Sequence, residues 1–359
     1  MLSPTISWRT FLILLSILIM TPIQAQAWLS EVDLSLYSPQ SYKAREIHQA
    51  VKLRVIGEKE NRVFIFIPAS PAPDNEVPVI FFHHGWQIMN PMNFGSLIDH
   101  LVRSGHVVIY PVFQDGERTS PLALTRNAGE ANRAALNKLA EEFSLTPKQG
   151  QTLYYGFSIG AAIAVNLALA HQDYGLPAPD AMMLVAPGDA YHLQLGQSFP
   201  SIYNTLEYLP ASLPIVIMTG EDDDIGLPTA RALYARLKHI PREHRILYTI
   251  PTSRTETRQV TAGHGSPGAP DSRYNFPPDQ QRFPTVLQGL PAYEKSASLN
   301  QLDFFGYWKI MDSLLDGLKN NGQFTDIVFG TGSPQQLNLG VWDNGTPLNP
   351  MTIENMPGE

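Results

Sequence analysis

The chain has 359 residues, of which 43% are hydrophobic and 16% charged, and it contains 30 prolines, 26 glycines and no cysteine. The lack of cysteine excludes disulfide scaffolds, cysteine-based zinc sites, thiol nucleophiles and lipid-modified N-terminal cysteines. A net charge of −8 without a run of Lys or Arg argues against a nucleic-acid partner, which needs a concentrated positive surface. We therefore expect a globular core that acts on a neutral or apolar small molecule.

The first 27 residues have the features of a secretory signal. Arg9 precedes an apolar run at 11–20, and the segment ends in the small-residue sequence Ala-Gln-Ala at 25–27. A helix that spans a bilayer needs about 20 apolar residues, roughly twice the length of this run. We therefore predict cleavage after Ala27 rather than a membrane anchor. The mature chain, residues 28–359, is expected to be one secreted or periplasmic domain without a stable membrane span.

From residue 50 onward, short apolar runs alternate with longer amphipathic stretches, a pattern that predicts an α/β fold. The runs at 78–82 and 181–186 are apolar on both faces, as in central parallel strands covered by helices on both sides. The first strands are expected to be antiparallel. In chain order, we predict strands at 51–56, 62–67 and 78–83, a helix at 93–104, a strand at 106–111, a helix at 126–142, a strand at 152–156, a helix at 159–171, strands at 180–186 and 214–219, a helix at 228–239, a strand at 245–250 and a last helix at 301–319.

Two segments do not follow this alternation. The connections at 187–212 and 265–300 are long and rich in aromatic residues, and the second holds six prolines. Long irregular connections are often lids or binding loops, so both segments are candidates for that role; packing without function is the alternative. Their rings could wall a substrate cleft or belong to the core. The segment at 322–359 is predicted to be an irregular C-terminal extension.

A nucleophile motif lies between a predicted strand and a predicted helix. Residues 156–160 read Gly-Phe-Ser-Ile-Gly, which is G-x-S-x-G with Ser158 at its centre. A sharp turn from strand to helix exposes the serine hydroxyl, and small flanking residues let the strand and the helix approach each other. On these residues the chain resembles the α/β-hydrolase superfamily over about 50–320. The resemblance implies a mostly parallel sheet with helices on both faces and lid-like loop insertions.

The resemblance also implies an oxyanion hole of two backbone N–H groups. One donor follows the nucleophile, here Ile159, and the other lies in the turn after the third strand, here Trp86 in the sequence His-His-Gly-Trp. His83 and His84 are expected to brace this turn by hydrogen bonding, since neighbouring residues on a strand point to opposite faces and cannot share a metal. Trp86 and Phe157 are the predicted substrate-binding side chains.

In this superfamily the catalytic acid follows the seventh strand. The segment 220–225 reads Gly-Glu-Asp-Asp-Asp-Ile, and the family pattern G-x-x-D places the acid at Asp223. Two neighbouring acids, Asp222 and Asp224, leave the choice open. Under the alternative interpretation, they are solvated loop charges or helix caps.

The catalytic base is found by elimination among ten histidines. The order serine, acid, histidine in this superfamily leaves His239, His244 and His264. His239 ends a predicted helix, and His244 precedes the eighth strand at the wrong end of the sheet. His264 lies in the glycine-rich turn Ala-Gly-His-Gly-Ser, although 13 residues separate it from the strand. We predict His264 as the base.

Together these residues predict an exported serine hydrolase that cleaves carboxylic esters through a Ser-His-Asp triad and an acyl-enzyme. The shared motifs are similar to those of secreted esterases near dienelactone hydrolase, chlorophyllase and platelet-activating-factor acetylhydrolase. The substrate is expected to be a small-molecule ester or a lipid. A lipase, phospholipase or thioesterase of the same fold is the alternative, followed by a non-catalytic binding protein. No cofactor is implied, and no metal site is expected because no zinc motif such as H-E-x-x-H is found.

Overall fold

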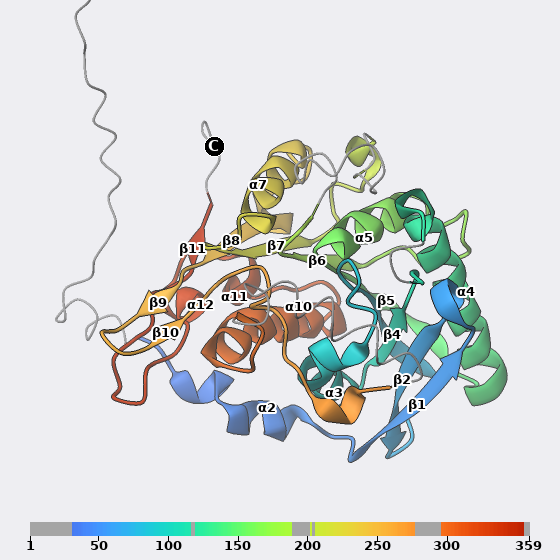
Figure 1. Ribbon diagram of the computed structural model, residues 1–359, viewed down its shortest axis with the longest axis horizontal. Coiled ribbons are helices and arrows are strands. Elements are labelled where there is room, and N and C mark those ends of the chain that lie inside the picture. The colour runs from blue at the N-terminus through green and yellow to red at the C-terminus, as the bar shows by residue number, and fades with distance from the viewer. Residues whose placement is uncertain (1–30, 116–118, 189–201, 203–204, 277–295, 355–359) are drawn as a thin grey trace, which may run out of the picture.

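One large sheet organises the protein (Figure 1). The computed structural model describes residues 31–115, 119–188, 202, 205–276 and 296–354. In this part of the chain the strand order is β1-β2-β4-β3-β5-β6-β7-β8-β11. The strands are β1 (Ala50–Ile56), β2 (Val63–Ser70), β3 (Glu76–His83), β4 (Val107–Pro111), β5 (Thr146–Phe157), β6 (Ala181–Val185), β7 (Ile215–Gly220), β8 (Arg245–Ile250) and β11 (Thr352–Ile353).

The centre of the sheet is parallel and its two ends are antiparallel. Strands β4, β3, β5, β6, β7 and β8 pair in parallel, whereas β2 is antiparallel to both β1 and β4. The short strand β11 adds an antiparallel edge to β8. A separate hairpin, β9 (Ser253–Arg254) and β10 (Gln259–Val260), follows β8. The sheet confirms the predicted α/β-hydrolase fold with antiparallel first strands.

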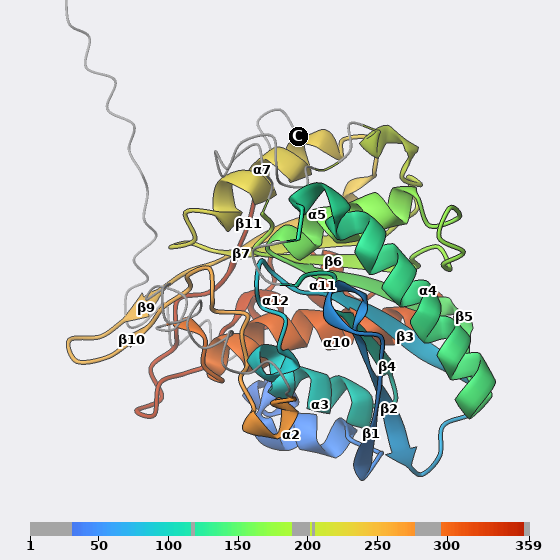
Figure 2. The same cartoon turned by 45° about the vertical axis from the view of Figure 1, so that its right-hand side comes forward.

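Helices cover both faces of the sheet, as the two views show (Figures 1 and 2). On one face lie α4 (Leu124–Phe143), α5 (Ile159–Leu169) and α7 (Gly226–Arg236), and on the other lie α2 (Pro39–Arg45), α3 (Gly95–Arg103), α10 (Lys309–Lys319), α11 (Asp326–Phe329) and α12 (Pro334–Leu337). Side chains alternate between two cores: on β6, Met182 and Leu184 face α5, whereas Met183 and Val185 face α10. The remaining helices are short: η1 (Leu34–Tyr37), η2 (Lys59–Asn61), η3 (Pro91–Phe94), η4 (Pro121–Ala123), η5 (Leu206–Tyr208), η6 (Arg242–His244), η7 (Ser272–Tyr274) and the π-helix η9 (Asp303–Trp308).

The predicted strands and helices are all found, with ends that shift by at most three residues except that β5 begins six residues earlier than predicted. The predicted helix at 301–319 divides into η9 and α10. The segment from the end of β8 to His264, for which no strand or helix was predicted, contains the hairpin β9–β10. The C-terminal extension contributes α11, α12 and β11 to the body of the protein.

Most of the two candidate loops, and the predicted signal at 1–27, lie outside the described residues. The described start of the second loop packs into the body of the protein. Tyr274 is buried and donates a hydrogen bond to Asp99 at 2.7 Å, while Phe276 lies against Phe64 and Phe66. Tyr274 therefore belongs to the core, and the partly buried Phe276 packs against it.

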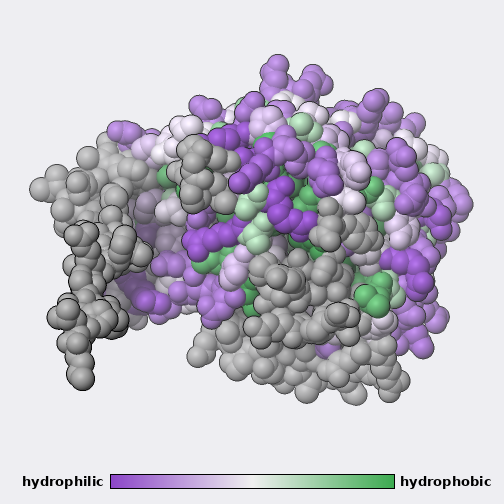
Figure 3. Space-filling view, turned by 90° about the horizontal axis from the view of Figure 1, so that it is seen from above, coloured by the Kyte–Doolittle hydropathy of each residue, from purple (hydrophilic) through white to green (hydrophobic). Residues whose placement is uncertain are grey.

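The surface seen from above is mostly hydrophilic, with hydrophobic side chains showing between the polar ones toward its middle (Figure 3). In the described part of the chain, the exposed large hydrophobic residues are scattered: Leu36, Ile47, Val55, Leu122, Tyr208 and Leu299. Among the described helices, none combines the length and the apolar character that crossing a bilayer requires.

Candidate active site

Ser158 lies at the sharp turn between β5 and α5. Its backbone has φ 54° and ψ −126°, a strained conformation for a residue other than glycine. The two motif glycines make the turn possible. A Cβ on Gly156 would lie 2.5 Å from the Gly160 carbonyl oxygen, and one on Gly160 would lie 2.1 Å from the His83 carbonyl oxygen. The turn therefore requires glycine at both positions, as the motif predicts.

Asp223 follows β7 and is held by the start of α7. Its Oδ1 accepts hydrogen bonds from the Gly226 N–H at 2.7 Å and the Ile225 N–H at 3.1 Å, and Thr219 donates to Oδ2 at 3.2 Å. A Cβ on Gly226 would lie 2.1 Å from this carboxylate, so only glycine leaves it room. The carboxylate is thus fixed in orientation within a buried site.

His264 joins the serine and the aspartate. Its Nδ1 lies 2.9 Å from Asp223 Oδ1, and its Nε2 lies 2.9 Å from Ser158 Oγ. Relative exposure is 8% for Ser158 and 1% for Asp223, while the His264 side chain is 19% exposed. Of the three side chains, Ser158 and His264 are therefore the ones that solvent and small molecules can reach.

The other two aspartates of the 222–224 run lie elsewhere. Asp222 accepts a hydrogen bond from Thr252 at 2.7 Å and contacts Arg254 at 3.4 Å, and Asp224 is exposed. Of the three carboxylates, Asp223 is the one in contact with His264. Asp222 instead joins the chain after β7 to the chain after β8.

The turn after β3, predicted to carry an oxyanion donor, lies close to the residue before the nucleophile. A Cβ on Gly85 would lie 2.9 Å from the Phe157 ring. The peptide after Trp86 is held by the segment that follows β4, because the Gln87 N–H donates to Gln114 Oε1 at 2.9 Å. Ile159 is the first residue of α5, so its N–H has no acceptor within the helix and points outward at the helix N-terminus.

His83 and His84 are both fully buried in this turn. His83 Nδ1 lies 3.1 Å from the Tyr155 carbonyl oxygen, and its Nε2 lies 3.1 Å from Asn132 Nδ2. The His84 ring nitrogens lie 2.6 and 2.8 Å from the carbonyl oxygens of Gly85 and Val112. Burial lowers the pKa of His83 to about 3 and that of His84 to about 4. The partners of His83, one carbonyl acceptor and one amide donor, fit an uncharged imidazole. Burial opposes a charge on His84 as well, whereas its two carbonyl partners favour the protonated ring.

The two predicted substrate-binding rings differ in exposure. Trp86 is half-buried and packs against the core on the α4 and α5 side of the sheet. Phe157 has no exposed surface and lies against Phe94 and His264. Phe157 therefore packs against the His264 ring and does not line an open cleft.

Gly188 is a site residue that the sequence reasoning missed. Its N–H donates to the Ser158 carbonyl oxygen at 2.9 Å. A Cβ at this position would lie 3.3 Å from Ser158 Oγ and 3.2 Å from Ile159 N. The sequence signal was Ala-Pro-Gly directly after β6, at the same edge of the sheet as Ser158. The absence of a side chain here leaves the serine hydroxyl open.

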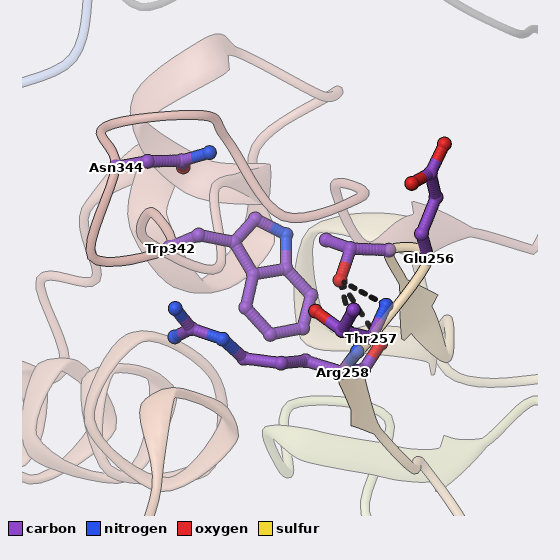
Figure 4. Close-up of a pocket in the computed structure, with 6 residues that line it drawn as sticks. Glu256, Thr257, Arg258, Trp342 and Asn344 are labelled. Carbon is purple, nitrogen blue, oxygen red and sulfur yellow. Dashed lines mark hydrogen bonds between the residues drawn. The ribbon is translucent and has the colours of Figure 1, made fainter.

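A separate pocket of about 260 Å³ lies between the β9–β10 hairpin and the C-terminal segment (Figure 4). Its lining is Thr255, Glu256, Thr257, Arg258, Trp342 and Asn344, and none of these is a predicted site residue. Thr255 Oγ1 accepts hydrogen bonds from the backbone of Thr257 and Arg258, and Arg258 pairs with Asp343. In the part of the chain that the structure describes, no group of three His, Asp or Glu side chains could hold a metal ion.

Solved structures with a similar fold include several esterases. An esterase from Pyrobaculum calidifontis is 16% identical, with 65% of this chain and 89% of that chain covered and a TM-score of 0.36. A structure of esterases from Rhizomucor miehei is 16% identical, with coverage of 77% and 98% and a TM-score of 0.40. The α/β-hydrolase enzyme MGS-M1 from a Medee basin deep-sea metagenome library is 14% identical, with coverage of 76% and 99% and a TM-score of 0.47. None of the curated proteins matches the chain.

The family model described as chlorophyllase matches residues 37–222, just over half of the chain. The matched region contains β1 to β7, the turn after β3 and the G-x-S-x-G elbow. With the sheet order described above, this defines a carboxylic ester hydrolase of the α/β-hydrolase fold. The chain belongs to the chlorophyllase family.

Proposed function

We propose that this protein cleaves carboxylic esters by covalent serine catalysis, with Ser158 as nucleophile, His264 as general base and Asp223 as the group that orients it. The observation that carries the proposal is the pair of 2.9 Å contacts that connect His264 with both other side chains. Hydrogen-bond reach between nucleophile and base, with a third group orienting the base, is the arrangement that activates a serine.

In the first half of the reaction, His264 Nε2 removes the Ser158 proton as Oγ attacks the acyl carbonyl. Asp223 accepts a hydrogen bond from the Nδ1–H group and stabilises the imidazolium that forms. The carbonyl oxygen becomes an oxyanion, for which we assign the N–H groups of Ile159 and Trp86. Preorganised donors of this kind contribute about 3–4 kcal/mol each in the transition state.

Acylation is complete when the imidazolium gives its proton to the leaving alcohol and the acyl group stays on Ser158. Deacylation follows. His264 then takes a proton from water, whose oxygen attacks the acyl carbon. Collapse of the second tetrahedral intermediate returns the proton to Ser158 and releases the acid. This cycle consumes one water and needs no cofactor.

The test is steady-state hydrolysis of p-nitrophenyl esters of increasing acyl length by the wild type and by Ser158→Ala. We expect the alanine variant to lose at least about 10⁴-fold in kcat while its thermal unfolding stays close to that of the wild type. A folded Ser158→Ala variant with near wild-type turnover would remove the proposal. Because the matching family is described as chlorophyllase, chlorophyll belongs in the substrate panel, with phospholipid and thioester substrates as competitors.

We also propose that the protein is exported. The support is the N-terminal segment, in which Arg9 precedes an apolar run of about ten residues and a small-residue site that ends at Ala27. Expression of the full chain, followed by fractionation and mass spectrometry, should give an extracytoplasmic protein that begins at Trp28. A full-length protein in the cytoplasm would contradict export and leave the proposed chemistry untouched.

A further inference from the structure

The helix that precedes the C-terminal segment begins as a π-helix, η9, and then continues as α10. Short π-helical segments often occur at functional sites, because the additional residue in the turn redirects side chains. Tyr307 lies in this turn and is buried, at 3% exposure. Its hydroxyl reaches the turn that carries His264.

A chain of hydrogen bonds connects the tyrosine with the histidine turn. Tyr307 Oη lies 2.8 Å from Ser266 Oγ, and Ser266 Oγ donates to the Gly263 carbonyl oxygen at 2.7 Å. A serine hydroxyl has one proton, and Ser266 donates it to the Gly263 carbonyl oxygen. The tyrosine is therefore the donor in the hydrogen bond between Tyr307 and Ser266. Burial raises the pKa of Tyr307 and keeps this proton on the phenol.

The histidine turn is thus held on both sides of His264. On the N-terminal side, the Ala262 N–H donates to Thr252 at 2.9 Å, and the Ala262 carbonyl oxygen accepts the Asp222 N–H at 3.0 Å. On the C-terminal side, Ser266 closes the turn onto Gly263 through its N–H as well as its hydroxyl. Tyr307 then fixes this closed turn against η9.

We propose that Tyr307 is a positioning residue, which acts through Ser266 to hold His264 where it contacts Ser158 and Asp223 together. The inference rests on the proposed serine mechanism. The base arrives after a 13-residue connection from β8, so the strand itself does not fix its position. The phenol supplies that constraint from a segment 41 residues beyond Ser266.

The test is Tyr307→Phe, which keeps the ring and removes only the hydroxyl. We expect kcat for a p-nitrophenyl ester to fall about tenfold, the effect of losing one aligned hydrogen bond, with KM within about twofold. The rate of labelling by a fluorophosphonate should fall in parallel, because that reaction also needs His264 to activate Ser158. Ser266→Ala should reproduce the loss, and the double variant should lose no more than either single variant.

Tyr248→Phe is the matched control. Tyr248 is also fully buried, and its hydroxyl contacts the Val328 carbonyl oxygen at 2.7 Å and Gln336 Nε2 at 2.6 Å, groups of the C-terminal segment. Its loss should lower the unfolding temperature but leave kcat within about twofold. Rates are normalised to folded protein by circular dichroism, and if Tyr307→Phe does not fold, Ser266→Ala carries the test.

Wild-type kcat in folded Tyr307→Phe and Ser266→Ala would overturn the inference, as would an equal loss in Tyr248→Phe. Ser158→Ala separates this failure from failure of the mechanism itself. If Ser158→Ala is inactive and Tyr307→Phe is unaffected, the serine mechanism stands and the positioning role is wrong.

Discussion

The elbow around Ser158 and the turn around His264 meet at 2.9 Å, but different interactions hold them in place. At the elbow, the determinants belong to one short motif: Gly156 brings β5 and α5 into backbone contact, and Gly160 lets α5 approach the end of β3 at His83. At the histidine turn, the determinants are distant segments, with Asp223 after β7 and Tyr307 in η9. One half of the site is thus encoded locally, and the other half depends on the assembled fold.

The family match follows the same division. Its matched region, residues 37–222, includes the elbow and the turn after β3 and ends before Asp223 and His264. A motif within a few residues keeps its spacing because strand and helix leave no room for change. A base presented by a long connection can change its spacing as long as its end reaches the serine.

The largest effect expected at the histidine turn is that of His264→Ala, matched with His239→Ala. Loss of the base should lower kcat by at least about 10⁴-fold, whereas the exposed His239 should leave kcat within about twofold. Ester hydrolysis by both purified variants is the measurement. Equal activity of the two variants would show that the turn after the hairpin does not supply the base.

Neighbouring aspartates give the next comparison. Asp223→Asn should reduce kcat by about 10³- to 10⁴-fold, because an amide no longer orients and stabilises the imidazolium. Asp222→Asn should keep kcat within about threefold and lower the free energy of unfolding by about 1 kcal/mol, since it weakens the contacts with Thr252 and Arg254. Steady-state kinetics and urea unfolding of both variants are the measurements. A larger loss of kcat in Asp222→Asn than in Asp223→Asn would show that Asp222 is the catalytic acid.

A third test adds volume at the elbow. In Gly188→Ala the new Cβ would lie 3.3 Å from Ser158 Oγ and 3.2 Å from Ile159 N, in the space that the acyl carbonyl needs. We expect kcat to fall about 10- to 100-fold, as misplacement by about 1 Å commonly does. The loss should grow with acyl bulk in the p-nitrophenyl ester series. An unchanged rate for every ester would place substrate on the other side of the serine.

The last test concerns the stability of the turn after β3 and does not involve kcat. Burial lowers the pKa of His83 from its ordinary value of 6.5 to about 3. The unfolded chain therefore binds protons first as the pH falls below about 6.5, and the fold loses stability. Relative to pH 7, the loss at pH 5 is about 2 kcal/mol for His83. Urea unfolding at pH 7 and pH 5 measures it, and His83→Gln should show a smaller pH dependence than the wild type.

Much of the fold could be predicted from the sequence, because buried parallel strands such as β6 and amphipathic helices such as α3 have strong patterns of their own. Short edge elements such as β11 could not, since two residues gain their strand conformation only from pairing with β8. The division of the last predicted helix into η9 and α10 depends on tertiary packing, which the hydrophobic periodicity of the sequence does not reveal.

For the site, Ser158 follows from a local motif, and elimination by chain order leads to His264. The choice among Asp222, Asp223 and Asp224 needed three-dimensional contacts, because all three satisfy the sequence pattern to within one residue. Gly188 and Tyr307 had no sequence signal of comparable strength. Each acts by its position in the assembled structure, one through an absent side chain and the other through a single hydroxyl.

The central claim is that His264 activates Ser158 for covalent attack. The most direct measurement is labelling with a fluorophosphonate, followed by peptide mass spectrometry of the wild type, Ser158→Ala and His264→Ala. We predict one adduct per wild-type chain on the peptide that contains Ser158, none in Ser158→Ala, and labelling slowed by at least about 10³-fold in His264→Ala. An adduct on another residue, or wild-type labelling without His264, would contradict the account.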